Sequence, residues 1–264
     1  MKKFILFSFG FCSSLVIPNA YSKNITIFTV SLPQSGTNLL AKCVEDITQK
    51  LHTSSSNLLV IKSHTLKKLT HKQFYVTHAP CVPSNLKEFN TLKIKGIFIY
   101  RDPRDHIVSS AYWIKKHPTY WPHLKDHTID ELISKLIKEY NTVLPLPSFP
   151  QFNSISNVYK LYLPWQFQPF IYTTTFERLV GSHGGGSKRK QLKEIKNIAC
   201  HLEIKLSTQQ VEKIAEQLFG NTSTFRKGKI GSWKEHFTKQ HKEDFKKIAG
   251  EILIELNYER DFNW

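Results

Sequence analysis

The sequence predicts an α/β fold in three layers, in which a central, mostly parallel sheet is flanked by helices on both faces. Short apolar strands alternate with amphipathic helices along the chain, which is the pattern of parallel sheets built from crossover connections. Two of the strands run directly into a tight turn and a helix, at residues 33–38 and 101–103. The chain has no internal repeat and no linker long enough to separate domains, so we predict one domain over residues 23–264.

The first strand-to-helix junction predicts an anion site. An alternating β-branched run predicts a buried strand over residues 25–30, which stops at Pro33 because proline cannot donate to a sheet ladder. A helix follows at once, and Thr37 or Asn38 can cap it. A Gly-containing turn and a helix N-terminus together direct backbone N–H groups at one spot. An ordinary strand-to-helix turn is the alternative, because the turn has no Lys and the full Walker pattern is absent.

The other elements follow from the same patterns. Further strands are predicted at Leu58–Ile61, Phe74–Thr77, Leu92–Tyr100 and Phe170–Thr174. Helices are predicted from Pro103 with Asp102 as N-cap, from Thr128 or Asp130 to Leu144, and at Gln191–Leu202, Ser207–Leu218 and Lys239–Leu256. Residues 145–165 are predicted to form loops and a docking surface, and residues 225–233 a basic loop broken by Gly.

The composition indicates a basic protein with a substantial core. Of the 264 residues 40% are hydrophobic, and 37 Lys and Arg against 21 Asp and Glu give a formal net charge of +16. Such an excess favours nucleic acid, anionic lipid, or a small ligand with several phosphates or sulfates, while a solvated basic surface is the alternative. The Lys residues form no dense run, so we expect no specific nucleic-acid partner. The four Cys residues show no metal-ligand spacing.

Residues 1–22 have the pattern of a targeting segment. Lys2 and Lys3 precede an apolar stretch at Phe4–Ile17 that is short for a membrane span, and residues 20–22 form a small-x-small cleavage site. A signal peptide is therefore predicted. An uncleaved anchor, with membrane association through residues 4–17, is the alternative.

Three separate segments offer groups for one polyanionic nucleotide. They are the turn at residues 33–38, Arg101 with Ser109 on the following helix, and the basic segment at residues 226–228, where Gly allows close backbone approach. Ligands of open α/β sheets bind at the carboxyl ends of the strands, where the first two segments lie. Each segment also has an ordinary explanation, since Arg101 can pair with Asp102 or Asp105, Ser109 can face a helix groove, and residues 226–227 can be a solvated loop.

In order and spacing, these segments resemble the sulfotransferases that use 3′-phosphoadenosine 5′-phosphosulfate (PAPS). The family's P-[KR]-S-G-T-[TN]-[WL] loop, which binds the 5′-phosphosulfate, is resembled by residues 33–39. Its R-[DN]-P-R-D-x-x-x-S element, whose Arg and Ser hold the 3′-phosphate, is matched by residues 101–109, and its R-K-G-x-x-G-x-W-[KR]-x-x-F loop by residues 226–237. Residues 176–187 are similar to the corresponding segment of bacterial members. The resemblance spans residues 25 to about 240.

The resemblance implies a P-loop-like fold, PAPS as donor and in-line sulfuryl transfer without a metal. It implies His78, in a T-H-x-P segment, as general base, with Ser109 and Gln34 as further catalytic residues. His64, which follows a Lys, is the competing base. The implied nucleotide-binding residues are Gln34, Ser35, Gly36, Thr37, Asn38, Leu39, Arg101, Ser109, Phe176, Arg226, Lys227 and Gly228. Phe176 is the aromatic candidate for stacking on adenine, because Leu39 replaces the Trp of animal cytosolic members.

The chain departs from the family pattern at two cations. The loop cation of the relatives is Gln34 here, and the Lys two residues before the base is Val76. Lys62 or another Lys is expected to compensate. A nucleotide-binding protein with weak or no catalysis is therefore an alternative. A nucleoside-triphosphate kinase or hydrolase is a further alternative, which the absence of a Lys from the loop and of a Walker-B-like strand ending in Asp disfavours.

The acceptor is expected to be a hydroxyl, or an amine, on a small molecule, glycan or peptide. Its pocket is expected within residues 113–169, through the aromatic residues Trp113, Tyr120, Trp121, Phe149, Phe152, Tyr159 and Trp165. The expectations for localisation conflict, because the signal-like segment favours an exported or anchored protein and PAPS use favours the cytoplasm.

Overall fold

A computed structural model describes residues 25–54, 59, 61–70, 72–88, 94–144, 153–220 and 225–264, without the side chains of residues 63, 64, 141 and 142. Its centre is a five-stranded sheet in the order β2-β3-β1-β4-β5, in which every pairing is parallel. The strands are β1 (Thr26–Ser31), β2 (Leu51–Thr53), β3 (Gln73–Thr77), β4 (Ile94–Tyr100) and β5 (Ile171–Thr175). The predicted targeting segment, residues 1–22, lies outside the described residues.

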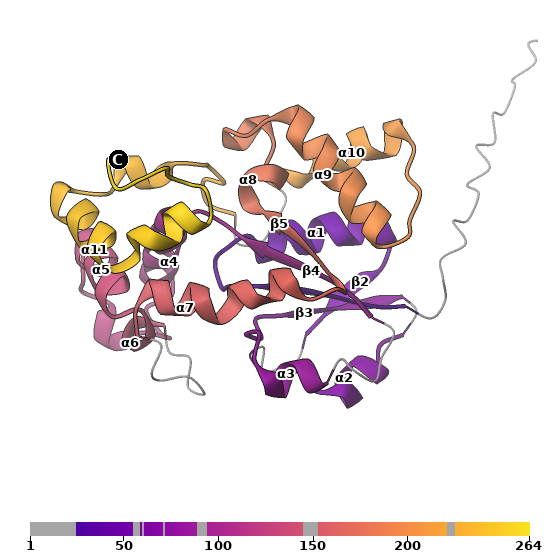
Figure 1. Cartoon of the computed structure of the whole chain (residues 1–264), viewed down its shortest axis with the longest axis horizontal. Coiled ribbons are helices and arrows are strands. Elements are labelled where there is room, and N and C mark those ends of the chain that lie inside the picture. Colours follow the sequence, from indigo (N-terminus) through magenta and orange to yellow (C-terminus); the bar gives the residue numbers. More distant parts are fainter. Residues whose placement is uncertain are drawn as a thin grey trace, which may run out of the picture.

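Helices cover both faces of the sheet, as Figure 1 shows. One face carries α1 (Thr37–Thr48), α8 (Phe176–Leu179), α9 (Lys188–His201) and α10 (Thr208–Leu218). The other face and the flanking bundle contain α2 (Ser63–Lys67), α3 (Pro83–Lys87), α4 (Pro103–Lys116), α5 (Ile129–Lys138), α6 (Tyr140–Val143), α7 (Ile155–Tyr162) and α11 (Lys239–Glu255). Short 3₁₀ turns occur at Pro122–Leu124, Leu163–Phe167, Ser182–Gly184 and Ser232–Glu235. The predicted three-layer α/β fold is confirmed.

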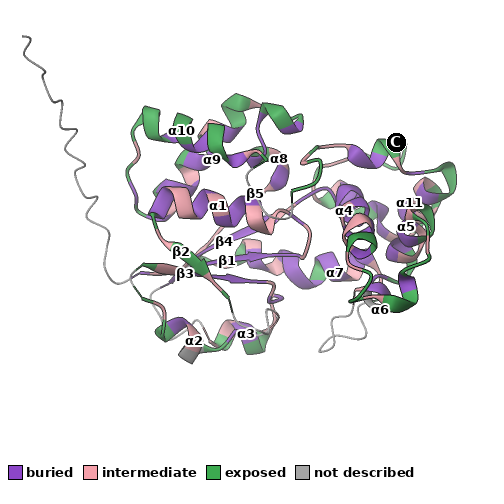
Figure 2. Cartoon of the chain, turned by 180° about the vertical axis from the view of Figure 1, so that it is seen from behind, coloured by how far each residue is buried: buried purple, intermediate pink, exposed green. Residues whose placement is uncertain are grey.

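Two hydrophobic cores follow from the alternation of side chains along the strands. Ile27 and Ile97 point to the core shared with α1 and α9, whereas their neighbours Phe28 and Phe98 point to the core shared with α4 and α7. The helices bury their inner sides on these cores and expose their outer sides (Figure 2). Both faces of the sheet are therefore covered, as expected of parallel sheets.

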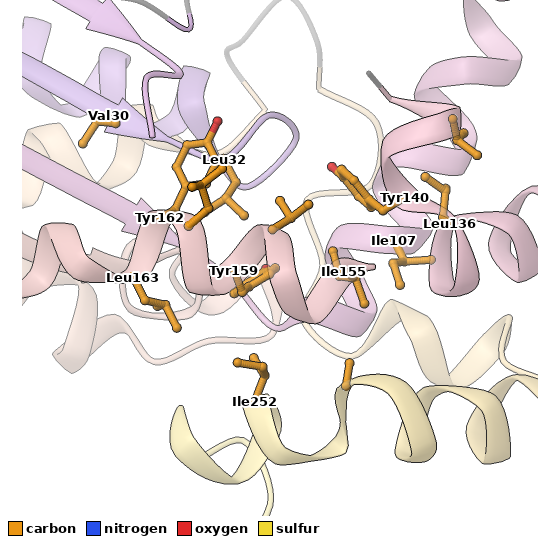
Figure 3. Close-up of a cluster of buried hydrophobic side chains, with 14 of the residues drawn as sticks. Val30, Leu32, Ile107, Leu136, Tyr140, Ile155, Tyr159, Tyr162, Leu163 and Ile252 are labelled. Atoms are coloured by element: carbon orange, nitrogen blue, oxygen red, sulfur yellow. The ribbon is translucent and has the colours of Figure 1, made fainter. Parts of the chain in front are cut away.

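The structure corrects several predicted elements. The second strand along the chain is β2, at Leu51–Thr53, and not the predicted strand at Leu58–Ile61. Of the residues predicted as that strand, Leu59 and Ile61 are described and neither is in a strand. The predicted docking surface contains α7, whose residues Tyr159 and Tyr162 are fully buried (Figure 3). Aromatic residues on this helix fill the core because the helix lies between the sheet and α11.

Candidate active site

A cavity of about 260 Å³ lies where the first residues of α1 and the ends of β3 and β4 meet the 225–232 loop. The predicted site residues that line it are Gln34, Gly36, Thr37, Asn38, Leu39, His78, Arg101, Ser109, Phe176, Arg226, Lys227 and Gly228. Ser35 is the exception, since it is fully buried and does not line the cavity. Its amide donates to the Leu32 carbonyl at 3.2 Å, which closes the turn. Three sequence segments far apart in the chain thus surround one space.

The turn before α1 needs its glycine. Gly36 has φ +105, a left-handed conformation that L side chains rarely adopt, and a Cβ there would lie 3.1 Å from Cδ2 of Phe176. Gly36 is also the N-cap of α1, so the predicted cap at Thr37 or Asn38 is wrong. The Thr37 hydroxyl instead contacts Ser31 Oγ at 2.7 Å. The start of α1 therefore faces the cavity with the positive end of its dipole.

His78 has the tautomer of a general base. Its Nδ1 lies 2.9 Å from the Ser31 carbonyl oxygen, which can only accept, so Nδ1 carries the proton of the neutral ring. Nε2 is then the unprotonated nitrogen, and it makes no hydrogen bond to another described residue. Burial lowers the pKa of His78, which the bond to Ser31 partly offsets, so the ring is neutral at pH 7. The ring can therefore accept a proton from a group in the cavity.

Residues of α7 and the following turn hold the His78 segment in place. Tyr162 donates its hydroxyl to the His78 carbonyl at 2.5 Å, and the Trp165 indole donates to the Ala79 carbonyl at 3.0 Å. Trp165 and Tyr159 are fully buried, so the expectation that they shape an acceptor pocket is wrong. Of the other residues expected there, Trp113 lines the cavity, Tyr120 is exposed, Trp121 is partly buried, and Phe149 and Phe152 lie outside the described residues.

Arg101 is buried between an aromatic ring and a carboxylate. Its guanidinium carbon lies 4.3 Å from the centroid of the Phe176 ring, and Nη2 lies 3.3 Å from both Asp105 Oδ2 and the Lys229 carbonyl. Its Nε is buried and has no hydrogen-bond partner among the described residues. The predicted alternative, a pairing with Asp105, is thus present, but it leaves part of the donor set of Arg101 unused.

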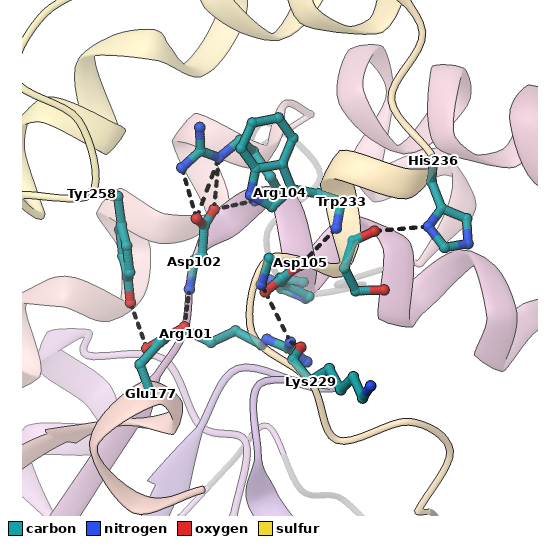
Figure 4. A network of polar contacts seen from close by, with 12 residues as sticks. Arg101, Asp102, Arg104, Asp105, Glu177, Lys229, Trp233, His236 and Tyr258 are labelled. Carbon is teal, nitrogen blue, oxygen red and sulfur yellow. Dashed lines mark hydrogen bonds and ion pairs between the residues drawn. The ribbon is translucent and has the colours of Figure 1, made fainter. Parts of the chain in front are cut away.

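Asp105 joins two of the predicted motifs (Figure 4). Its two carboxylate oxygens accept the backbone N–H groups of Gly231 and Trp233 at 2.8 and 2.9 Å, while Oδ2 also pairs with Arg101. Asp105 is 1% exposed, and burial raises its pKa, against the opposing effect of the Arg101 charge. The carboxylate therefore fastens the 225–233 loop beside Arg101.

Arg104 has a structural place next to this site. Its guanidinium bonds the N-cap residue Asp102 and Glu259, and stacks 3.9 Å from the Trp233 ring centroid. It does not line the cavity. Of the two Arg residues in the R-D-P-R-D motif, Arg101 is therefore the one available to a ligand.

Phe176 is positioned by the residue that follows it. Glu177 accepts the Asp102 backbone N–H at 2.9 Å through one oxygen and the Tyr258 hydroxyl at 2.9 Å through the other. Burial is the main effect on Glu177 and raises its pKa. These bonds tie α8 to the end of β4, which keeps the Phe176 ring against Arg101.

The 225–232 loop brings further cations to the cavity. Arg226 lies 4.0 Å over the Tyr112 ring, Lys227 pairs with Glu235 at 2.9 Å, and Lys229 also lines the cavity. Gly228 has φ +59, and a Cβ there would lie 2.5 Å from a ring carbon of Phe225. The loop thus approaches the cavity through bare backbone while its side chains supply positive charge.

Sequence reasoning missed several lining residues. They are Asp105 as a clamp, Val180, Leu218, Phe219, Gly220, Phe225, Lys229 and Ser232. Asp105 could be found from its place in the motif, but the apolar residues look like ordinary core positions. Lys62, which we expected to compensate for Gln34, does not line the cavity; the lysines that do are Lys227 and Lys229.

The donor set fits an anionic nucleotide. An unused buried guanidinium nitrogen, a helix N-terminus and a bare-backbone loop all adjoin one cavity, whose lining carries four cations and one carboxylate: Arg101, Arg226, Lys227, Lys229 and Asp105. In the described part of the chain, no three His, Cys, Asp or Glu side chains lie close enough to hold a metal ion. No described helix is long and apolar enough to cross a membrane.

Comparison with known proteins gives one family. Among solved structures, the mouse sulfotransferase SULT7A1 complexed with PAP has a TM-score of 0.67 and 21% identity, over 90% of this chain and 87% of that chain. Retinol dehydratase in complex with androsterone and inactive cofactor PAP has a TM-score of 0.54 and 16% identity, over 86% and 80%. Among curated proteins, none has a sequence that matches this chain. The family model for the sulfotransferase domain matches residues 24–257, so the chain belongs to the sulfotransferase domain family.

Proposed function

We propose that this protein is a PAPS-dependent sulfotransferase that transfers a sulfuryl group in line to a hydroxyl or amine acceptor. The observation that carries the proposal is that a neutral His78, the N-terminus of α1 and the Arg101 guanidinium all line one cavity. PAPS supplies the sulfuryl group and the nucleotide leaving group. The relatives complexed with PAP support this choice of donor.

The chain's own residues divide the work between two anionic ends of the nucleotide. Residues 34–39, at the start of α1, would hold the 5′-phosphosulfate through backbone N–H groups and the helix dipole. Arg101, Ser109 and the 226–228 segment would hold the 3′-phosphate, since they gather guanidinium, hydroxyl and ammonium donors on one side of the cavity. Phe176, already stacked on Arg101, is the candidate for contact with adenine.

His78 would act as general base. Nε2 would accept the acceptor's proton as its oxygen or nitrogen becomes bonded to sulfur, while Nδ1 keeps its bond to Ser31 and so fixes the ring. Gln34 can donate a hydrogen bond to the leaving oxygen but adds no charge. A nucleotide-binding protein with slow or no transfer is the second candidate, and Gln34 is the observation that favours it.

For the acceptor we propose an alcohol, phenol, sugar, peptide hydroxyl or amine that enters beside Trp113. The retinol dehydratase structures hold androsterone and retinol, which are alcohols. We also propose that residues 4–17 associate with a membrane, either as a signal peptide or as an anchor. Whether the protein acts outside the cytoplasm or within it depends on which of these two functions residues 4–17 have.

The test is calorimetric titration of the full chain with 3′,5′-adenosine bisphosphate, with ATP as the comparison ligand. Ser109 is the best position for a substitution, because it lines the cavity and its hydroxyl makes no hydrogen bond to another described residue. Losing one hydrogen bond to a charged group predicts binding weaker by about 10-fold to 150-fold in Ser109→Ala. Ser110→Ala is the matched control, since Ser110 is buried and outside the cavity. Equal binding by both variants, or no preference over ATP, would refute the assignment.

A further inference from the structure

The outward face of α9 carries charge of one sign. Five exposed cations lie along this helix: Lys188, Arg189, Lys190, Lys193 and Lys196. None of them forms a salt bridge with a described residue. The one carboxylate of the helix, Glu194, is 4% exposed and accepts the Tyr172 hydroxyl at 3.0 Å on the inner side. Nothing on α9 itself therefore neutralises its exposed face.

Two other surface helices do not share this segregation. On α10 the exposed Lys213 lies between Glu212 and Glu216, and on α11 Lys239 lies 3.9 Å from Glu243. These helices show the mixed charges of an ordinary solvated surface. The uniform charge of α9 is therefore a local feature and not a reflection of the basic composition alone.

The position of the cations within α9 is also unfavourable for the stability of this helix. Lys188, Arg189 and Lys190 occupy the first turn, where positive charge opposes the helix dipole and acidic residues are favoured. Ser187 still caps this end through its bond to the Lys190 N–H at 3.3 Å. A sequence that breaks a local rule without a visible structural gain points to a functional requirement.

The geometry of the charged face fits a flat partner. Arg189, Lys193 and Lys196 are spaced i, i+4 and i+7 and so form one row, with Lys188 and Lys190 on its two sides. The opposite side of the helix, with Ile195 and Ile198, is buried on the sheet. The row runs over seven residue steps of the 14-residue helix, which is about 10 Å along its axis. Figure 2 shows exposed residues along the outer side of α9.

From these observations we infer that the basic face of α9 docks on an anionic lipid surface. Charge complementarity requires an anionic partner, and the sequence carries a second membrane signal in the apolar residues 4–17.

An extended anionic acceptor is the competing partner. The five cations do not line the cavity, and α9 packs behind α8 on the side of Phe176, away from His78. An anionic acceptor held at His78 would therefore not need contacts with these five cations. The membrane inference stands independently of the proposed sulfotransfer, because it concerns a different surface.

The experiment is flotation of the full chain with vesicles of phosphatidylcholine, alone or mixed with phosphatidylserine, at low and high salt. The quantity measured is the ratio of partition coefficients for mixed and neutral vesicles, which cancels any insertion of residues 4–17. The variant is Arg189→Gln, Lys193→Gln, Lys196→Gln. We expect this ratio to fall about fivefold for each cation removed and about a hundredfold for all three.

The matched control removes the same charge from α11 with Lys239→Gln, Lys242→Gln, Lys247→Gln. We expect the control to retain most of the ratio, and both variants to bind 3′,5′-adenosine bisphosphate as the wild type does. Equal losses in the two variants would show an effect of net charge only and would overturn the inference. So would a wild-type ratio near one, or a variant that loses heparin binding while its lipid ratio is unchanged.

Discussion

Replacing His78 by Asn separates the two functions of this ring. The Asn side chain has an N–H that can donate to the Ser31 carbonyl, as Nδ1 does at 2.9 Å, but it has no nitrogen that accepts a proton. The tether is kept and the base is lost. We therefore expect kcat to fall by about 10²-fold to 10⁴-fold, or about 3–5 kcal/mol of transition-state stabilisation, with unchanged affinity for 3′,5′-adenosine bisphosphate.

The pH dependence gives the same test a second readout. Burial lowers the pKa of His78 from its ordinary value of 6.5, so the ring stays unprotonated to a lower pH than a free His. The wild-type kcat/KM should be level above pH 6.5 and should fall tenfold per pH unit once the pH drops below the pKa of His78. In His78→Asn this acidic decline should be absent.

The assay follows PAP release from PAPS with an acceptor found by screening alcohols, phenols, sugars and amines. His64→Asn is the matched control, because His64 is the competing candidate from the sequence and its change should leave turnover unaltered. Near wild-type turnover in His78→Asn would refute the assignment of the base. A loss confined to His64→Asn would move the role to that residue.

Two further predictions concern residues at or beside the site. Gln34→Lys places a cation in the turn, where φ is already +64, and should raise kcat about tenfold or more without tighter nucleotide binding; a lower kcat would mean that another group supplies the charge. His106 is fully buried, and burial lowers its pKa to about 3, so below about pH 6.5 the unfolded chain binds a proton that the folded chain does not. The free energy of unfolding should therefore fall on acidification, with about 1.4 kcal/mol per pH unit due to His106. Urea denaturation of His106→Gln between about pH 6 and 4.5 should show a slope smaller by that amount, and an unchanged slope would contradict the reasoning.

Sequence patterns predict the strands and helices of this fold well where the burial of side chains determines both the residue pattern and the structure. The strands β1, β3, β4 and β5 all lie within two residues of the predicted ranges at their described ends, because β-branched and aromatic residues are concentrated in them. Side-chain caps mark some of the predicted helix starts, but α9, capped by Ser187, begins three residues before the predicted Gln191. Asp102 caps α4 as predicted, and Ser207 caps α10 in a capping box with Gln210.

The missed elements lack such a signal for physical reasons. β2 is a three-residue edge strand whose Leu51 is 72% exposed, so it has no buried face to impose a pattern. α7 lies in an aromatic-rich stretch, residues 149–165, which suggested a surface for ligands. Its burial depends on helices and strands that are distant in the sequence, and no local pattern reports such contacts.

In the candidate site, too, some residues could be predicted from the sequence and others could not. The residues that would touch phosphate groups stand at turns and helix starts, where Gly, Ser and Arg are conspicuous, and the structure brings them to one cavity. The supporting residues are not conspicuous. Tyr162 and Trp165 support His78 from the core, and only the fold shows that aromatic residues more than 80 positions away bond the carbonyls of this segment.

Asp105 links the two motifs that we propose to bind the 3′-phosphate. A carboxylate this deeply buried carries a desolvation cost, which its raised pKa reflects, and its bonds to two backbone N–H groups and Arg101 offset that cost. The same bonds set the 225–233 loop against α4. A nucleotide bound in the cavity would thus meet cations already held in position, and its binding would not need to order the loop. The charge of Arg101 is only partly neutralised, because two of the three groups that donate to the Asp105 oxygens are backbone N–H groups and the Lys229 carbonyl that accepts from Arg101 is uncharged. The buried Nε of Arg101 would remain available to a phosphate.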